Sequence, residues 1–174
     1  MYYLKDKGYL NPVQLRLNEL KLSQSKCASL AGISRMVVLR STQGMYQTLA
    51  ARMVRILDIP YVDLSDSYVE WQQDQRLLQA VWVGTAPVYE TQYHPFVAWR
   101  LLYAPEKTRM GICKLLCLHP NTIKLYEEGT QKTVPDSLLK ALDTGGMDRE
   151  NRHRLVDLSA KWISSLGSST GLQE

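Results

Sequence analysis

Three potential metal ligands, Cys113, Cys117 and His119, fall within seven residues of the chain. Cysteine and histidine are the usual ligands of zinc, but a structural zinc site needs four, and no fourth ligand follows at the spacing of a zinc finger. The other histidines, His94 and His153, have no neighbouring nucleophile or carboxylate that would suggest catalysis. The chain also has no glycine-rich phosphate-binding loop. We therefore predict no metal, no cofactor and no enzymatic activity.

Positive charge is concentrated in two segments of a chain whose net charge is only +4. Residues 12–57 contain seven Lys and Arg residues and one acidic residue. Residues 96–142 contain seven Lys and Arg residues and four acidic residues. Two cationic blocks on a chain of small net charge are typical of a surface that binds a polyanion. Solvated helix faces are the alternative explanation, and charge alone does not exclude them.

The two cationic segments are related by an internal repeat with an offset of 85 residues. Residues 23–44 align without a gap with residues 108–129. The alignment pairs residues of similar size and polarity: Ser23 with Thr108, Leu30 with Leu115, Ile33 with Leu118, Val38 with Ile123, Gly44 with Gly129, Met53 with Leu138 and Leu57 with Leu142. Asn11-Pro12 and His94-Pro95 also correspond, with a shift of two residues. The repeat predicts one structural unit present twice.

Capping residues divide each copy into four predicted helices. In the first copy, Asn11 caps a helix that starts at Pro12, and Ser23 caps a second helix that Gly32 ends. Ser34 caps a third helix, which runs to Gly44, and a fourth covers roughly 48–57. The second copy offers the corresponding residues: Pro95 at the start of the first helix, Thr108 as the cap of the second, Pro120 at the start of the third, and Pro135 and Asp136 in the first turn of the fourth.

An amphipathic segment follows each copy, at about 65–82 and about 148–166. The apolar stripes are Tyr68, Trp71, Leu78 and Trp82 in the first and Leu155, Leu158, Trp162 and Leu166 in the second. Such stripes favour packing on their own unit or on each other, and self-association of the chain is the alternative. We predict a first unit at 1–83, a linker at 84–93, a second unit at 94–166 and a flexible Ser/Gly-rich tail at 167–174.

The sequence favours a cytoplasmic protein with no membrane contact. No apolar run approaches the ~18 residues of a membrane-spanning helix. The first eight residues carry charge too early for a secretion signal. The three cysteines are an odd number, which fits a reducing compartment better than a disulfide scaffold.

The pattern Ser-Gln-x-x-x-Ala-x-Leu-Ala-Gly-Ile-Ser-Arg at 23–35, followed by Gly44, resembles the Cro/C1-type (XRE) helix-turn-helix of phage and bacterial regulators. The resemblance covers about 15–60 and, less closely, about 96–143. It implies an all-α fold with two tandem lambda-repressor-like helix-turn-helix units, with motifs at 23–44 and 108–129, each followed by an amphipathic helix. Cys27 falls at a position that the family buries in its core.

The resemblance also implies how the turn between the two motif helices is built. Helices that cross closely need a small residue, which Ala28 and Cys113 supply, and a turn with positive φ, which Gly32 supplies. Cys117 replaces this glycine in the second copy, so it must adopt the same conformation at a cost or change the turn.

The family places the third helix of each unit in the major groove of DNA. The inward positions are then Val38 and Ser41 in the first copy and Ile123 and Tyr126 in the second. The candidate DNA-binding residues are Gln24, Ser34, Arg35, Met36, Leu39, Arg40 and Gln43 in the first copy, and Arg109, Asn121, Thr122 and Lys124 in the second.

These residue types suit different parts of a duplex. Arg35 and Arg40 can pair with guanine O6 and N7 or hold a phosphate, and Asn121 suits adenine N6 and N7. Lys124 suits a phosphate or guanine. Met36 can contact a thymine methyl or a protein partner.

Residues at the ends of the motif helices have other predicted roles. Gln24 and Arg109 begin the second helix of each copy, where the helix N-terminus assists phosphate binding. Glu127 and Glu128 end the third helix of the second copy, and we predict that both are solvated.

The sequence thus predicts a transcription regulator that binds double-stranded DNA sequence-specifically, as a repressor or control protein of a phage or mobile element. Two tethered motifs would act as a covalent pseudo-dimer that reads unlike half-sites. Two alternatives remain: an adaptor, antirepressor or antitoxin in which one motif docks a protein partner, and a purely structural helical scaffold.

Overall fold

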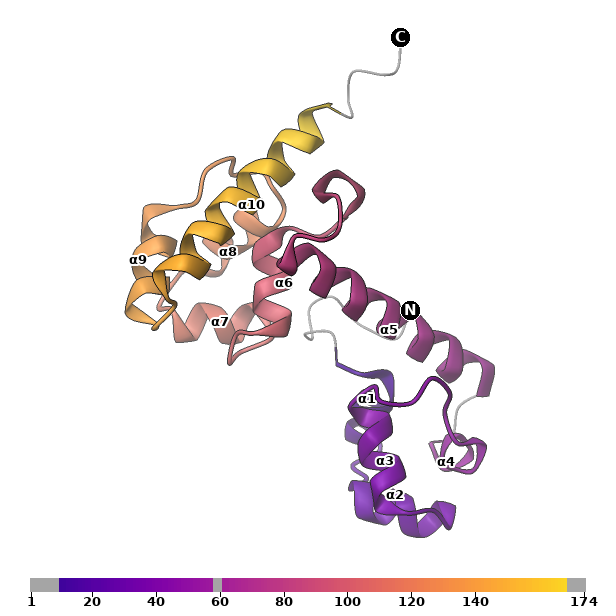
Figure 1. Cartoon of the computed structure of the whole chain (residues 1–174). Coiled ribbons are helices and arrows are strands. Elements are labelled where there is room, and N and C mark those ends of the chain that lie inside the picture. Colours follow the sequence, from indigo (N-terminus) through magenta and orange to yellow (C-terminus); the bar gives the residue numbers. More distant parts are fainter. Residues whose placement is uncertain (1–9, 58–60, 169–174) are drawn as a thin grey trace. The chain divides into compact units, whose positions relative to one another are not determined.

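The computed structural model describes residues 10–57 and 61–168, and within these ranges the chain is all-helical, with ten α-helices and no strand (Figure 1). This confirms the all-α prediction. The helices are α1 (Pro12–Glu19), α2 (Gln24–Ala31), α3 (Arg35–Thr42), α4 (Ala51–Ile56), α5 (Tyr61–Val83), α6 (Pro95–Leu102), α7 (Arg109–Leu115), α8 (Pro120–Glu127), α9 (Asp136–Thr144) and α10 (Arg149–Ser168), with a short 3₁₀ helix, η2 (Val88–Glu90).

The chain forms two compact units, which meet between Gln75 and Arg76. We call the part up to Gln75 unit 1 and the part from Arg76 onward unit 2. The division falls inside α5, whereas the predicted units were separated by the linker at 84–93. Within that predicted linker the structure has η2.

The core of unit 1 is built from the faces predicted to be apolar. α2 packs against α3 and α4, and α1 packs against α3. Val13, Cys27 and Val38 are fully buried in this core, together with Leu64 and Tyr68 from the first half of α5. The predicted core position of Cys27 is therefore confirmed, and the first half of the trailing helix packs on its own unit.

Side-chain caps begin four of the helices at residues that the sequence predicted. Asn11, Ser23, Ser34 and Thr108 each accept a backbone N–H of the first turn that follows. These bonds satisfy donors that have no partner within the helix. α4 is shorter than predicted, because it begins at Ala51 rather than near 48 and has no side-chain cap.

The turn after the second helix has the same backbone conformation in both units. Gly32 has φ 61° and Cys117, which replaces it in unit 2, has φ 51°. The left-handed region costs a residue with a side chain about 1–2 kcal/mol relative to the right-handed helix. Of the two possibilities at Cys117, the structure has the strained residue rather than a changed turn.

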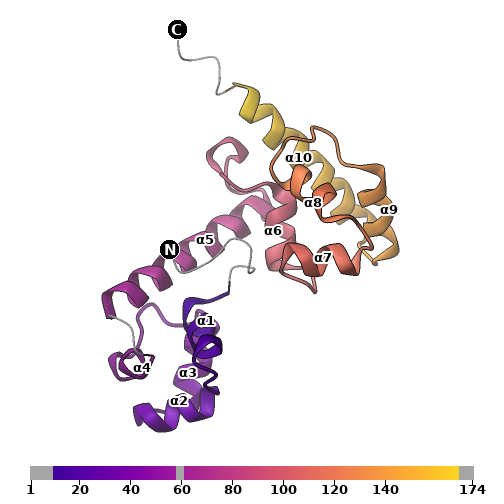
Figure 2. The same cartoon turned by 180° about the vertical axis from the view of Figure 1, so that it is seen from behind.

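Unit 2 is closed by α10, which packs against α6, α9 and η2. Leu155, Leu158 and Trp162 of the predicted stripe are buried, but Leu166 is exposed. α10 lies in front in Figure 1, and the view from behind shows α8 in front of it (Figure 2). The two helices are in contact, since the Tyr126 hydroxyl of α8 donates to Ser159 Oγ of α10 at 2.7 Å.

The predicted tail begins later than 167. α10 continues to Ser168, so Gly167 and Ser168 are helical. The rest of the predicted tail, 169–174, lies outside the described residues, as do residues 1–9, which include the charged N-terminal segment.

The second half of α5 belongs to unit 2 rather than to the unit it follows. Leu78, Val81 and Trp82 are buried there. The Arg154 guanidinium of α10 lies 5.8 Å from the Trp82 ring centroid, within the range of a cation–π contact. α5 therefore contributes one end to each core.

No helix in the described part of the chain combines the length and apolar character needed to cross a bilayer.

Candidate nucleic-acid interface

α3 divides its side chains between the core and the surface as predicted. Val38 and Ser41 are fully buried. On the other side, Leu39 is partly buried, and the remaining predicted DNA-binding residues of α3 and its ends are exposed: Ser34, Arg35, Met36, Arg40 and Gln43. The helix therefore presents two guanidinium groups and a thioether to solvent on one short surface.

Buried polar contacts fix the position of α3. The side chain of Asn11, the cap of α1, donates from Nδ2 to the Ser41 carbonyl at 2.8 Å. The Ser41 hydroxyl donates to the Val37 carbonyl, also at 2.8 Å. Because Asn11 and Ser41 are buried, a polar group of either residue left without a partner would cost about 1–3 kcal/mol. A small hydroxyl residue at position 41 is thereby accommodated in the core.

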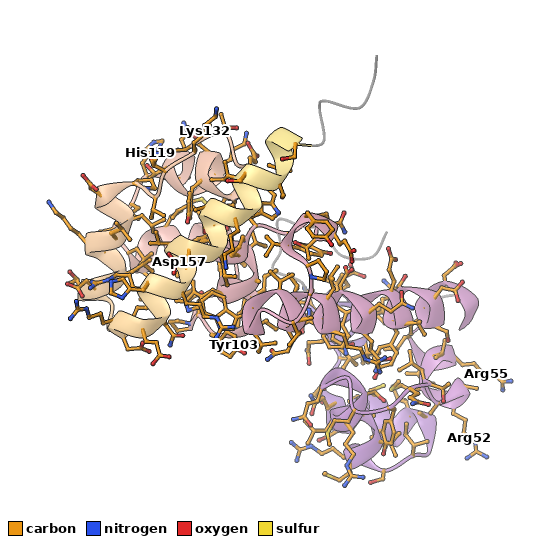
Figure 3. All side chains as sticks on the ribbon, turned by 45° about the horizontal axis from the view of Figure 1, so that its top comes forward. Arg52, Arg55, Tyr103, His119, Lys132 and Asp157 are labelled. Carbon is orange, nitrogen blue, oxygen red and sulfur yellow. The ribbon has the colours of Figure 1, made fainter. Side chains whose placement is uncertain are left out.

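Unit 1 has no acidic residue between Leu20 and Leu57. Five exposed cations lie on α2, α3 and α4 in this stretch: Lys26, Arg35, Arg40, Arg52 and Arg55. None of them forms an ion pair with a residue that the structure describes. Figure 3 shows Arg52 and Arg55 extending from α4 away from the rest of the unit. This surface can attract an anion without first breaking an internal ion pair.

α8 repeats the arrangement of α3 with different chemistry. Ile123 and Tyr126 are fully buried, Thr122 is partly buried, and Asn121 and Lys124 are exposed. Lys124 Nζ lies 4.0 Å from Glu128, which is exposed as predicted. The exposed side of α8 thus carries an amide and a lysine whose charge is offset by a neighbouring carboxylate.

His119, which the sequence analysis considered only as a metal ligand, caps α8. Its Nδ1 accepts the Asn121 backbone N–H at 3.2 Å. Neutral histidine carries one ring proton, so this bond leaves the proton on Nε2. The side chain is exposed at the beginning of α8 (Figure 3). An N–H donor therefore stands beside Asn121, and the alignment with Ser34 was the feature that could have identified it.

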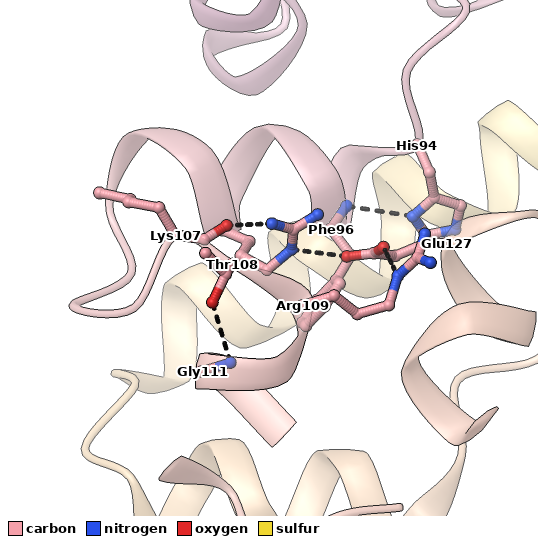
Figure 4. A network of polar contacts seen from close by, with 8 residues as sticks. His94, Phe96, Lys107, Thr108, Arg109, Gly111 and Glu127 are labelled. Atoms are coloured by element: carbon pink, nitrogen blue, oxygen red, sulfur yellow. Dashed lines mark hydrogen bonds and ion pairs between the residues drawn. The ribbon is translucent and has the colours of Figure 1, made fainter. Parts of the chain in front are cut away.

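The prediction that Glu127 is solvated is wrong. Its side chain is 2% exposed and lies between two guanidinium groups. Arg100 Nε donates to Oε1 at 2.6 Å, and Arg109 Nε donates to Oε2 at 2.8 Å (Figure 4). Arg100, which is itself buried, also donates to the Lys107 carbonyl. A buried carboxylate keeps its charge at low cost only when it is paired in this way.

This network changes the interpretation of Arg109, which was predicted to hold a phosphate. Its guanidinium is bonded to Glu127 within unit 2. The corresponding residues in unit 1 are Gln24 and Thr42, and they too are in contact, with Gln24 Nε2 donating to Thr42 Oγ1 at 3.3 Å. The first residue of the second helix therefore bonds to the last residue of the third helix in both units.

A tryptophan packs on the glycine that follows the third helix in both units. Gly44 and Gly129 have φ 74° and 71°. A Cβ added to Gly44 would lie 2.5 Å from Trp71, and one added to Gly129 would lie 2.5 Å from Trp162. Both positions therefore need glycine for two reasons, its conformation and the close approach of the ring. The stripes of the trailing helices contained these two tryptophans, but spacing alone could not show what they contact.

His94, the cap of α6, is buried in unit 2. Its Nδ1 accepts the Phe96 backbone N–H at 3.1 Å (Figure 4). Its ring lies edge-on to Tyr126 and Trp162, with centroid distances of 4.4 and 4.9 Å. Burial lowers the pKa of His94 from its ordinary value of 6.5 to about 3, because the charged form is poorly solvated there. His94 is a neutral packing residue.

Neither a metal site nor a match to a known protein adds to this description. Cys113 is buried in α7 and Cys117 is exposed in the turn that follows. Over residues 10–57 and 61–168, no three His, Cys, Asp or Glu side chains are grouped to hold a metal ion. Comparisons with family models, with curated proteins and with solved structures gave no match.

Proposed function

We propose that the chain is a sequence-specific double-stranded DNA-binding transcription regulator that uses two tandem helix-turn-helix units. α3 and α8 are the recognition helices, and each enters a major groove with its N-terminal residues facing the base edges. The observation that carries the proposal is the acid-free surface of α2, α3 and α4, on which five cations are exposed. DNA affinity comes largely from neutralising phosphates, and such a surface supplies the charge.

The shared construction of the two units supports a second DNA-reading helix. Each unit has two short helices joined by a positive-φ turn, and each has a third helix with two buried positions and an exposed side. The same glycine–tryptophan contact follows α3 and α8. Two tethered units bind as one ligand, because the second contact is intramolecular at an effective concentration near millimolar.

The residues divide into base-reading and phosphate-binding groups. Arg35 and Arg40 pair with guanine O6 and N7 or hold phosphates, and Asn121 pairs with adenine N6 and N7. Ser34, Met36, Leu39, Gln43 and Thr122 surround these groups on the exposed or partly buried sides of the two helices. By resemblance, the regulator is a cytoplasmic repressor or control protein of a phage or mobile element.

Selection of bound duplexes from a random pool tests the proposal and gives the operator. We expect Arg35→Ala and Asn121→Ala each to weaken binding to the selected operator by about 1–3 kcal/mol, because Arg35→Ala removes a guanine or phosphate contact and Asn121→Ala removes a bidentate adenine contact. Lys161→Ala, which removes an exposed cation of α10 outside both motifs, is the charge-matched control and should change affinity little. Failure to enrich any sequence would contradict sequence-specific binding.

A second candidate function is an adaptor, antirepressor or antitoxin in which unit 2 docks a protein. Three large apolar side chains on α7 and α8 favour it, since Met110, Leu115 and Leu125 are all more than 40% exposed. The same variants discriminate between the two functions. If Asn121→Ala and Lys124→Ala leave DNA binding unchanged while Arg35→Ala abolishes it, the adaptor is favoured.

A further inference from the structure

The exposed cations of unit 1 have almost no counterparts in unit 2. With the offset of 85, Lys26, Arg35, Arg40 and Arg52 correspond to Gly111, Pro120, Leu125 and Ser137. Only Arg55 keeps its charge, as Lys140. The two motifs therefore share a backbone arrangement but not an electrostatic one.

Unit 2 has cations at other positions, and nearby acids pair with two of them. Residues 24–56 contain five Lys and Arg residues and no acidic residue. The corresponding residues 109–141 also contain five Lys and Arg residues, but they contain three acidic residues as well. Arg109 bonds to the buried Glu127, and Lys124 lies 4.0 Å from Glu128. A phosphate that approaches α8 meets a lysine and a carboxylate together, so its net attraction is small.

Neutral hydrogen-bonding groups remain on the exposed side of α8. Asn121 presents an amide, Thr122 a hydroxyl, and His119 an Nε2–H, because its Nδ1 is engaged in capping the helix. Such groups can distinguish base edges but release few counterions from the duplex.

We infer that the two units have different tasks on DNA: the α2–α4 surface of unit 1 supplies the salt-dependent phosphate affinity, and α8 of unit 2 supplies sequence discrimination through neutral donors and acceptors. This inference rests on the proposed DNA binding and deepens it. The operator is accordingly read by two chemically unlike helices, of which only the first holds the duplex by charge.

The dependence of affinity on salt separates the two tasks. Each phosphate contact contributes about −0.9 to the slope of log K against log salt concentration. We expect the double variant Lys26→Gln/Arg40→Gln of the full chain to make this slope less negative by about 2. The matched double variant of unit 2, Lys114→Gln/Lys124→Gln, should change it by less than about 0.5.

Sequence discrimination should depend on α8 of unit 2 and not on the cations of unit 1. The ratio of affinities for the selected operator and for a duplex altered in one half-site is the measurement. Asn121→Ala should reduce this ratio by about 5- to 150-fold for the half-site that unit 2 reads, with the salt slope unchanged. Lys26→Gln/Arg40→Gln should weaken binding to both duplexes by the same factor, because phosphate contacts carry no sequence information.

A reciprocal exchange at one aligned position adds a gain-of-function test. Leu125 is exposed on α8 and corresponds to Arg40 of α3, so Leu125→Arg transfers the unit 1 cation to unit 2. We expect Leu125→Arg to make the salt slope steeper by about 1 and Arg40→Leu to make it shallower by about 1. Circular dichroism spectra of both variants should match that of the unmodified chain.

Three outcomes would overturn the inference, and they can be told apart. Equal changes of slope for the two double variants would show that both units bind phosphates. A unit 2 that affects neither slope nor discrimination, with no effect of Leu125→Arg, would show that α8 does not touch DNA and would favour protein docking. An unmodified chain with no salt-dependent DNA binding would overturn the proposed function together with the inference.

Discussion

The Glu127 carboxylate lies in a nearly solvent-free position of unit 2, where a lone charge would cost several kcal/mol. Arg100 and Arg109 neutralise it from two sides. The aligned residues of unit 1 are Leu17, Gln24 and Thr42. Gln24 and Thr42 form an uncharged version of the contact, and Leu17 is buried in the core. The two units therefore have a charged and an uncharged set of residues at corresponding positions.

This set can be exchanged as a whole. We predict that Glu127→Thr alone destabilises unit 2 by about 3–5 kcal/mol, because it leaves the charge of the buried Arg100 without its carboxylate partner. The triple variant Arg100→Leu/Arg109→Gln/Glu127→Thr, which installs the unit 1 residues, should regain most of the loss. Urea unfolding followed by circular dichroism measures both. A triple variant no more stable than the single one would contradict this account.

His94 gives stability a defined pH dependence. Burial lowers its pKa from 6.5 to about 3. Between pH 6.5 and pH 3, His94 is therefore protonated in the unfolded chain and neutral in the folded chain. The contribution of His94 is fully present above pH 6.5 and is lost as the pH falls toward 3, by about 1.4 kcal/mol per pH unit. The charged form is never favoured in the folded state over this range.

His94→Asn tests this dependence, because Asn11 already caps the corresponding helix of unit 1. We expect the variant to be less stable at pH 7.5, since it loses the ring contacts, but to lose less further stability on acidification. The measurement is the unfolding free energy from urea titrations at pH 4 to 7.5. Parallel curves for the two proteins would rule out His94 as the titrating group.

At the residue scale, the sequence predicted local chemistry well and distant partners poorly. Asn11 and Ser34 as caps and Gly32 as the turn residue follow from short-range rules. Glu127 was assigned to solvent because two adjacent acids at a helix end resemble a solvated terminus. Its partners come from 27 and 18 positions away, a separation that local patterns do not encode.

Among the elements, the trailing helices matter for the motif because each places a tryptophan on the glycine that ends it. Gly44 has positive φ and no room for a Cβ beside Trp71, whereas Gly32 has positive φ and open space around it. Substituting Gly32 therefore tests backbone conformation alone, whereas substituting Gly44 tests conformation and packing together.

We predict that Gly32→Ala costs about 1–2 kcal/mol, because only the left-handed conformation opposes it. Gly44→Ala should lower the free energy of unfolding by about 1–3 kcal/mol more than Gly32→Ala does, because Trp71 must also move. Thermal and urea unfolding of the two variants give the comparison. If the two costs are equal, the ring contributes nothing to the need for glycine.

The order and type of the helices could be predicted, since caps and apolar periodicity act within a few residues. The alignment even identified the strained position of Cys117. The ends of the helices were less certain, because α4 begins at Ala51 without a side-chain cap to mark it.

At the scale of the whole molecule, α5 belongs to two cores. Leu64 and Tyr68 are buried in unit 1, while Leu78 and Trp82 are buried in unit 2. The apolar stripe predicted that one side of α5 is buried, but it did not predict which unit covers that side. Periodicity identifies the apolar side of a helix and not the element that packs on it. The boundary expected at the Gly/Pro-containing segment 84–93 therefore differs from the division within α5.

Separate cores should unfold separately. We predict that Glu127→Thr raises amide hydrogen exchange throughout α6–α9 but leaves α1–α3 protected, because destabilisation spreads within a cooperative unit and not beyond it. Exchange measured by mass spectrometry on peptides from each unit provides the comparison, with Gly44→Ala as the reciprocal perturbation of unit 1. Equal deprotection of all helices would mean that the chain unfolds as one unit.

The placement of Trp71 and Trp162 gives each half of the chain its own spectroscopic reporter. Both indoles lie on the backbone just past the helix proposed to enter the groove, at Gly44 and Gly129. The chain has only two other tryptophans, Trp82 and Trp99. Biosynthetic incorporation of fluorotryptophan would therefore yield four ¹⁹F resonances, two of them from residues packed just after α3 and α8. Titration with an oligonucleotide would then reveal which half engages first.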